Sequence, residues 1–230
     1  KYDVTEDRTV HQYETFFVDD YSFYLYEINK DVTPHHTAFT AKVALYTSSD
    51  DTDDVLNAVA KHYGVSVGTI KTGIATQGEA SLAAVYLLRG QTGYGKLKLG
   101  KLLGVSPQSV DAAITASMRA AQSSPEIRQV IHQIHTRYSE HVADLFPAKW
   151  TYKKSPEPTS EVAIEHFVAK SLLKQLAGRD VYLNLNGFTQ DMKAANIRIH
   201  VNPLVNWVWL GIILLLLGTV LCLIPQRWVD

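Results

Sequence analysis

Residues 38–64 read AFTAKVALYTSSDDTDDVLNAVAKHYG, and the spacing of their apolar side chains changes halfway through. Apolar residues first alternate with other types at a period of two, which is typical of a half-buried β-strand. After the polar run 48–51 they recur at every fourth position, at Val55, Val59 and Tyr63, and so share one face of a helix. The segment therefore predicts a strand followed by a capped helix that ends at Gly64.

Strand-like patterns lie on both sides of a helical region. Aromatic and β-branched residues are dense over 13–28, where two aspartates interrupt them, and this predicts a hairpin. Periodic apolar residues predict further helices at 79–89, 97–103, 107–120 and 125–142, of which the last two begin with a Ser-Pro pair suited to a helix start. Short strands are expected again at 149–152, 161–167, 181–185 and 197–201.

This order predicts an α+β protein: a small antiparallel β domain interrupted by an α-helical bundle insertion and followed by one C-terminal transmembrane helix. We expect residues 1–47 and 146–201 to form the two parts of the β domain and 48–145 to form the helical insertion. Residues 202–230 are expected to form the transmembrane helix and its tail. The insertion should fold by itself, because few contacts cross linkers of this kind.

The C-terminal region carries a long apolar run. The 21 residues 204–224 include no charged side chain, and a helix of that length spans the roughly 30 Å hydrocarbon core of a bilayer. Indole rings favour membrane interfaces, and Trp207, Trp209 and Trp228 lie toward the two ends of the run. Asn202 and Pro203 suit the start of a helix, as a cap residue and a proline in the first turn. The pattern predicts a membrane span with these five residues at its interfaces.

Composition excludes several kinds of site. The net charge of -1 gives no general attraction to nucleic acid or acidic lipid. The single cysteine, Cys222, lies in the apolar run, which excludes an intrachain disulfide, a CxxCH haem-attachment motif and a zinc knuckle. The sequence contains no Gly-rich phosphate loop and no nucleophile elbow. We therefore expect no catalytic residue of these classes.

Nine histidines raise the question of a metal or haem site. His132 and His135 share a helix face and His35 adjoins His36, but neither pair is completed by a cysteine or a carboxylate cluster. We interpret these four as surface or packing histidines. His200, beside the predicted membrane boundary, is the position at which haem contact is worth testing.

Three segments resemble, in order, the end of the F-type haem lyase family of cytochrome c maturation: 159–164 (TSEVAI), 179–187 (RDVYLNLNG) and 197–211 (IRIHVNPLVNWVWLG). Residues 149–152 (KWTY) are similar to a family stretch that precedes them. The resemblance implies a bacterial inner-membrane protein with a single C-terminal span and the bulk of the chain in the periplasm. It also implies a scaffold portion of a complex that delivers haem and attaches it to apocytochrome c.

In that family, haem is handled by a Trp-rich segment and by histidines of earlier helices, neither of which occurs in this chain. The resemblance therefore implies no catalytic, cofactor-binding or metal-binding residue here, with haem held elsewhere in the complex. Whether the chain takes part in an enzyme is left open. The implied partners are other transmembrane helices and subunits of the maturation complex, apocytochrome c and the lipid bilayer.

The predicted insertion resembles a different family, the helical DNA-binding domain of the replication initiator DnaA. The similar segments are 55–66, 84–89 and 99–110, and the last has helix-turn-helix form. The alternative function is thus a membrane-tethered DNA-binding regulator, whose candidate contacts are Lys96, Lys98, Lys101, Gln108 and Ser109. Over 51–141, however, nine Lys or Arg stand against seven Asp or Glu, a small surplus for a duplex binder. Nucleic acid is therefore the less expected partner.

Overall fold

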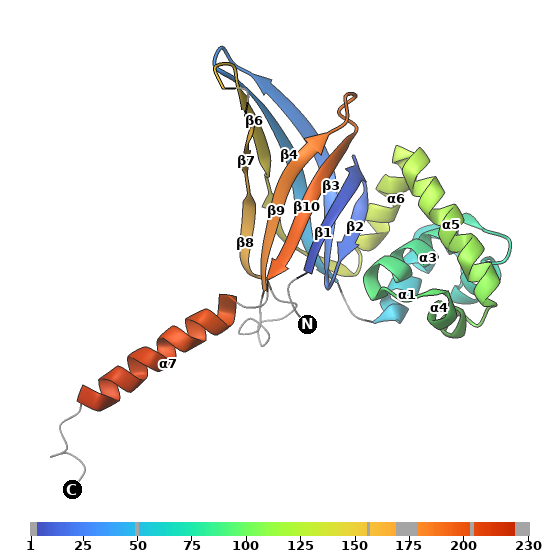
Figure 1. Ribbon diagram of the computed structural model, residues 1–230. Helices are drawn as coiled ribbons and strands as arrows, with labels where there is room; N and C mark the ends of the chain where they lie inside the picture. The colour runs from blue at the N-terminus through green and yellow to red at the C-terminus, as the bar shows by residue number, and fades with distance from the viewer. Residues whose placement is uncertain (1–3, 49–50, 156, 169–178, 203–204, 224–230) are drawn as a thin grey trace, which may run out of the picture.

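The computed structural model describes residues 4–48, 51–155, 157–168, 179–202 and 205–223. Within these ranges the chain is an α+β protein with seven helices and two antiparallel sheets (Figure 1). One sheet has four strands in the order β1-β10-β9-β8. The other has six, in the order β2-β3-β4-β6-β7 with β5 paired to β4. Helices α1 to α6 form a unit at one side of the sheets, and α7 extends away from them.

The elements have the following bounds. The four-stranded sheet consists of β1 (Val4–His11), β8 (Ala163–Val168), β9 (Arg179–Phe188) and β10 (Ala194–Asn202). The six-stranded sheet consists of β2 (Thr15–Val18), β3 (Tyr21–Val32), β4 (His36–Ser48), β5 (Ser139–Leu145), β6 (Ala148–Tyr152) and β7 (Thr159–Glu161). The helices are α1 (Thr52–Tyr63), α2 (Val67–Thr72), α3 (Glu79–Thr92), α4 (Lys96–Leu103), α5 (Pro107–Ser123), α6 (Pro125–His135) and α7 (Val205–Leu223).

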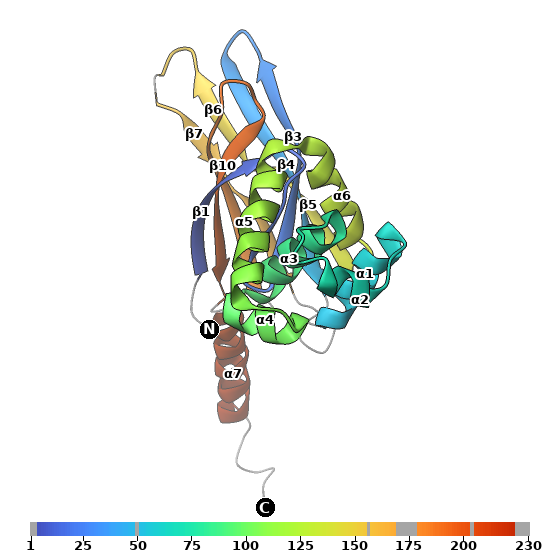
Figure 2. The same ribbon diagram turned by 90° about the vertical axis from the view of Figure 1, so that its right-hand side faces the viewer.

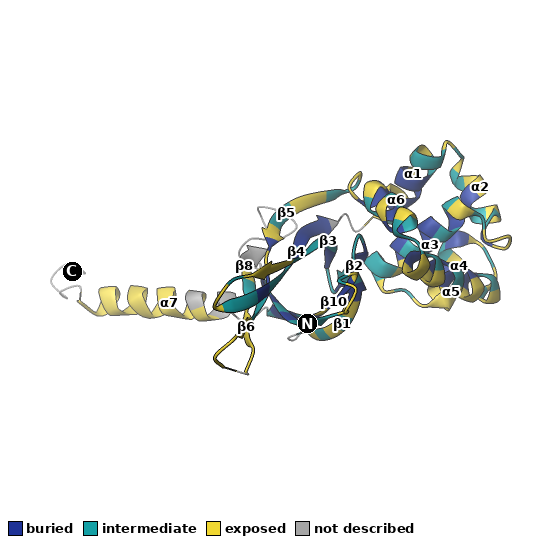
Figure 3. Ribbon diagram, turned by 90° about the horizontal axis from the view of Figure 1, so that it is seen from above, coloured by how far each residue is buried: buried dark blue, intermediate teal, exposed yellow. Residues whose placement is uncertain are grey.

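The two sheets face each other across a shared apolar core (Figure 3). Alternate residues of each strand turn inward, because successive side chains of a strand point to opposite faces. The inward side chains of the six-stranded sheet include Phe16, Phe23, Leu25, Val43 and Leu45. Those of the four-stranded sheet are Val181, Leu183, Leu185, Ile197, Ile199 and Val201.

Strand β4 holds the six-stranded sheet together. Its first half pairs with β6 and its second half with β5, so these two strands follow one another along the same edge. The N–H of Ala41 donates to the carbonyl of Pro147 at 3.0 Å, between the two ladders. Residues 48–145 are predicted to form the helical insertion, but β5 lies within this range and belongs to the six-stranded sheet. The helices of this range end at His135.

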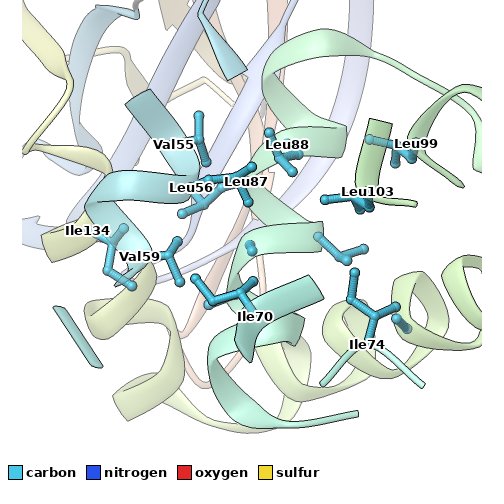
Figure 4. Close-up of a cluster of buried hydrophobic side chains, with 14 of the residues drawn as sticks. Val55, Leu56, Val59, Ile70, Ile74, Leu87, Leu88, Leu99, Leu103 and Ile134 are labelled. Carbon is cyan, nitrogen blue, oxygen red and sulfur yellow. The ribbon is translucent and has the colours of Figure 1, made fainter. Parts of the chain in front are cut away.

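The helical unit has its own core and its own end signals. The side chain of Asp51 accepts a hydrogen bond from the Asp53 N–H at the start of α1, and Gly64 ends that helix with a φ of 65°. Ser-Pro pairs begin α5 and α6. Figure 4 shows the core, in which apolar residues of five helices and of the segment after α2 meet: Val55, Leu56, Val59, Ile70, Ile74, Leu87, Leu88, Leu99, Leu103 and Ile134.

The C-terminal helix differs from the prediction. α7 contains 19 residues. Among the residues that the structure describes, no helix is both long and apolar enough to cross a membrane. The predicted transmembrane helix within 202–230, and with it the single-span inner-membrane localisation, is therefore wrong.

Candidate functional site

The helical unit meets the six-stranded sheet through α3 and α6, which contact β2. Figure 2 shows the helices in front of the sheets. On α6, Arg128, His132 and His135 follow one another at spacings of four and three residues. Such spacing places side chains on one face of a helix. All three make hydrogen bonds to residues of the β domain. We call this contact the helix–sheet interface.

Two imidazoles lie at the centre of the helix–sheet interface. The ring of His132 stacks on that of Tyr24, with centroids 3.4 Å apart, and its Nδ1 lies 3.3 Å from Thr15 Oγ1. His135 is fully buried, with its Nε2 2.9 Å from Ser22 Oγ and its Nδ1 3.1 Å from Ser139 Oγ. Since both ring nitrogens of His135 are engaged, neither is available to ligate a metal or a haem iron.

The aromatic rings of the interface are uncharged at neutral pH. Burial lowers the pKa of His132 to about 4. Burial, with a smaller contribution from His132, lowers the pKa of His135 to about 3. Burial also raises the pKa of Tyr24 to about 12. Neutral rings can be buried without leaving an unpaired charge. These rings therefore suit a stable contact between the helical unit and the six-stranded sheet.

Two longer-range hydrogen bonds fix the position of the helices. The Nε of Arg128 donates to the Gln12 carbonyl at 2.8 Å, while its Nη1 donates to the carbonyls of Ala121 and Gln122 at 2.8 and 3.1 Å. The hydroxyl of Tyr86 on α3 donates to the Thr15 carbonyl at 2.9 Å. Burial raises the pKa of Tyr86, which keeps the hydroxyl protonated and able to donate.

Beside Tyr86 lies a cleft of about 600 Å³, bounded by β1, β2, α3 and α5. We call it the interface cleft, because both units contribute its walls. Its charged and titratable side chains are Glu6, Arg8, His11, Glu14 and Arg89, and its apolar side chains include Phe17 and Met118. Glu14 is 8% exposed and accepts the His11 N–H at 2.9 Å. The cleft lining thus combines charged and apolar side chains.

The helix-turn-helix segment is formed by α4, a turn over 104–106 and α5. Of the candidate DNA contacts, Lys96 and Gln108 line a groove of about 640 Å³ along α5. The Lys96 Nζ lies 3.3 Å from the carboxylate of Asp111. The Lys98 Nζ lies 3.5 Å from the centre of the Tyr94 ring.

The other two candidate contacts differ in their surroundings. Lys101 is exposed on α4. Ser109 belongs to the cap of α5, where its N–H donates to the Ser106 Oγ at 3.1 Å. The structure therefore brings Lys96 and Gln108 together on one surface and commits Ser109 to a helix end.

The residues singled out near the C-terminus are spread over several elements. Asn202 ends β10, in register with Asp180. Trp207 and Trp209 belong to α7, whereas Pro203 and Trp228 lie outside the described residues. His200 has its Nδ1 2.8 Å from Thr5 Oγ1 and lines a shallow pocket of about 310 Å³.

Of the other histidine pair, His36 packs with its ring centroid 4.7 Å from that of Trp150. His35 is exposed in the turn between β3 and β4. The two adjacent histidines therefore have different surroundings.

Sequence reasoning missed the residues of the helix–sheet interface and of the cleft. Arg128 carries a weak signal, since it precedes His132 and His135 at helical spacing on the face next to the apolar stripe. Arg8, Glu14 and Arg89 carry no such signal, because they come from different elements that only the fold brings together.

Neither a metal-ligand cluster nor a similar protein indicates the function of this site. Within the described ranges, no group of three or more His, Cys, Asp or Glu is arranged to hold a metal ion. Comparison of the chain with protein-family models, with characterised proteins and with solved structures finds no match.

Proposed function

We propose that this chain is a non-catalytic scaffold part of a haem lyase complex for cytochrome c maturation. The observation that carries the proposal is the grouping of the segments that resemble that family. Of these segments, residues 163–164, 179–187 and 197–202 lie in β8, β9 and β10, which are neighbours in one sheet. Residues 149–152 and 159–161 lie in β6 and β7 of the other sheet, both of which contact β9, and 205–211 begin α7. The resembling segments thus lie on neighbouring elements of the β domain and on the start of α7.

A scaffold needs a surface for its partners, and α7 offers one. This helix follows β10 after two residues, and its leucines are widely exposed, for example Leu215 at 70% and Leu221 at 67%. A continuous apolar surface of this kind marks a site of protein contact. In the proposed complex, α7 packs against apolar helices of the other maturation proteins, and haem is held by those proteins.

The test uses the tagged full-length chain in cells that mature c-type cytochromes. We expect the chain to co-purify with the other maturation proteins, and Leu215→Asp to lower both their recovery and the amount of haem-bearing cytochrome. Leu97→Asp is the matched control, because Leu97 is 68% exposed but lies in the helical unit. It should leave both quantities unchanged. Loss of maturation with the complex intact would assign α7 to substrate or haem contact and refute the scaffold role.

A second candidate, a DNA-binding regulator, is favoured by the helix-turn-helix arrangement of α4 and α5. Against it, Asp111 is exposed in the first half of α5 and pairs with Lys96, which places a carboxylate where phosphates would approach. Fluorescence anisotropy with a labelled duplex tests this candidate. A DNA-binding protein would lose affinity in Lys98→Glu/Lys101→Glu and on addition of salt. If neither the double substitution nor added salt lowers the affinity for the duplex, the DNA-binding function is excluded.

A further inference from the structure

The interface cleft holds basic groups whose hydrogen-bonding capacity the protein does not use up. Arg8 approaches the carboxylate of Glu14 at 3.4 Å and that of Glu6 at 3.9 Å. Both distances exceed the roughly 2.7–2.9 Å of a strong charge-assisted hydrogen bond, and a guanidinium has about five N–H donors. Arg89, in the last turn of α3, forms no ion pair with any residue that the structure describes. The two arginines can therefore both donate to a bound group.

Three further polar groups around the cleft, those of Glu14, Tyr86 and Ser117, are already bonded within the protein. Glu14 accepts from the His11 N–H and from Arg8, and the hydroxyl of Tyr86 donates to Thr15. The hydroxyl of Ser117 donates to the Ile114 carbonyl at 2.9 Å. The positive charge available to an anionic ligand is thus concentrated at Arg8 and Arg89.

Part of the cleft lining is apolar. It includes Phe17 and Met118, and the Met118 side chain is 41% exposed although it is large and apolar. The volume of about 600 Å³ falls within the range of small-molecule sites, which are roughly 300–1,000 Å³ and often lie where two structural units meet. A ligand that fits this cleft has an anionic end and an apolar body.

We propose that the interface cleft binds a monocarboxylate with an adjoining apolar group. The carboxylate lies between Arg8 and Arg89, and the apolar group lies against Phe17 and Met118. A phosphate fits less well, because its second negative charge would be repelled by Glu6 and Glu14. The chemistry is that of a peptide's C-terminal residue or of a free organic acid of similar size. Because both units wall the cleft, the ligand also stabilises the helix–sheet interface.

The test compares two probes that differ in one charge, N-acetyl-leucine and N-acetyl-leucinamide, by isothermal titration calorimetry on the full chain. The acid should bind about tenfold more tightly than the amide, because the amide cannot form the charged contact with the arginines. Arg89→Gln should weaken binding of the acid about tenfold without lowering the melting temperature of the free protein, since Arg89 is exposed. Arg119→Gln is the matched control, on an exposed face of α5 outside the cleft. It should leave the affinity unchanged.

A third probe separates the two sources of the carboxylate. An acetylated tripeptide that ends in leucine should bind more tightly than N-acetyl-leucine if the natural ligand is a peptide terminus, and no more tightly if it is a free acid. The proposal is overturned if the acid and the amide bind equally, if Arg89→Gln and Arg119→Gln behave alike, or if no binding occurs at millimolar concentrations of acid.

Discussion

The ring of Phe17 occupies the space into which a side chain at Gly90 would project. A Cβ placed on Gly90 would lie 2.2 Å from the Cδ2 of Phe17, far inside van der Waals contact. Phe17 cannot withdraw easily, since its ring also packs edge-on against His135, with centroids 5.7 Å apart. The absence of a side chain at Gly90 therefore sets how closely α3 approaches β2.

Gly90→Ala should destabilise the protein by about 1–2 kcal/mol. Helix propensity alone favours alanine by about 1 kcal/mol, but overpacking of a fixed contact costs about 1–3 kcal/mol, and at this distance we expect the clash to dominate. Urea denaturation measures the difference. Gly95→Ala is the control, because no atom lies within 4 Å of its Cβ and its φ is -74°. A stabilised Gly90→Ala variant would show that α3 does not pack tightly on Phe17.

The protein should lose stability as the pH falls from about 6.5 toward 4, because of His132 and His135. Their pKa values in the folded protein, about 4 and about 3, lie below the ordinary value of 6.5, so the unfolded chain takes up protons first. The stabilisation is complete above pH 6.5 and is lost as the pH falls toward the folded-state values. Each histidine lowers the free energy of unfolding by up to about 1.4 kcal/mol per pH unit. Urea denaturation at several pH values measures this slope.

Substitution separates these histidines from other titrating groups. His135→Gln should be less stable than the natural chain at pH 7.5, and its stability should depend less on pH below 6.5. His35→Gln replaces an exposed histidine and should leave the slope unchanged. An identical slope in all three proteins would mean that the buried imidazoles do not govern acid sensitivity.

Arg128→Met should destabilise the protein by about 2–4 kcal/mol, since it leaves the carbonyls of Gln12, Ala121 and Gln122 without a donor at a buried position. The thioether keeps much of the side chain's volume, so the loss reports mainly on the hydrogen bonds. Arg137→Met, at an exposed position, should change stability by less than about 0.5 kcal/mol. Hydrogen exchange should increase in α6 of the Arg128 variant. Equal exchange in both variants would show that Arg128 does not fasten this helix.

Local features of the fold could be predicted from the sequence because their causes are local. The change of apolar period near residue 50, the Asp51 cap and the Gly64 stop all act within one or two turns of α1. The helix predicted over 125–142, by contrast, ends at His135, and β5 begins at Ser139. The apolar residues keep helical spacing as far as Tyr138, which is why the helix is predicted to continue. The residues after Tyr138 instead pair with the edge of β4, which is distant in sequence.

The candidate site was less predictable for the same reason. The spacing of His132 and His135 was visible, but the tyrosine and serine partners of these residues come from β3 and β5. The cleft joins Arg8 and Glu14 of the N-terminal region to Arg89 of α3. Periodicity reports which face of an element is apolar, and it does not report which other element that face will meet.

Ser48 and Ser139 are register partners at the end of the β4–β5 ladder, so the chain leaves the sheet and returns to it at neighbouring points. This geometry defines where the helical unit can be excised. Removing 49–138 and joining the ends by Asn-Gly keeps β5, because a two-residue turn closes an antiparallel pair. Removing 48–145 deletes β5, and with it Leu145, which is 3% exposed in the core between the sheets.

We expect the 49–138 excision to give a cooperative thermal melt with a β-type circular dichroism spectrum. Its melting temperature should be lower than that of the full chain. Removal of α6 takes away the histidine rings that pack on Phe17, Tyr24 and Tyr46, and so exposes these side chains to solvent. The 48–145 excision should melt without cooperativity, since half of one edge of β4 is left unpaired and the core is opened. If both excised proteins melted cooperatively at the same temperature, β5 would be dispensable. If neither did, the helices would be an integral part of the β fold, because the sheets would then depend on the contacts of His132, His135 and Arg128.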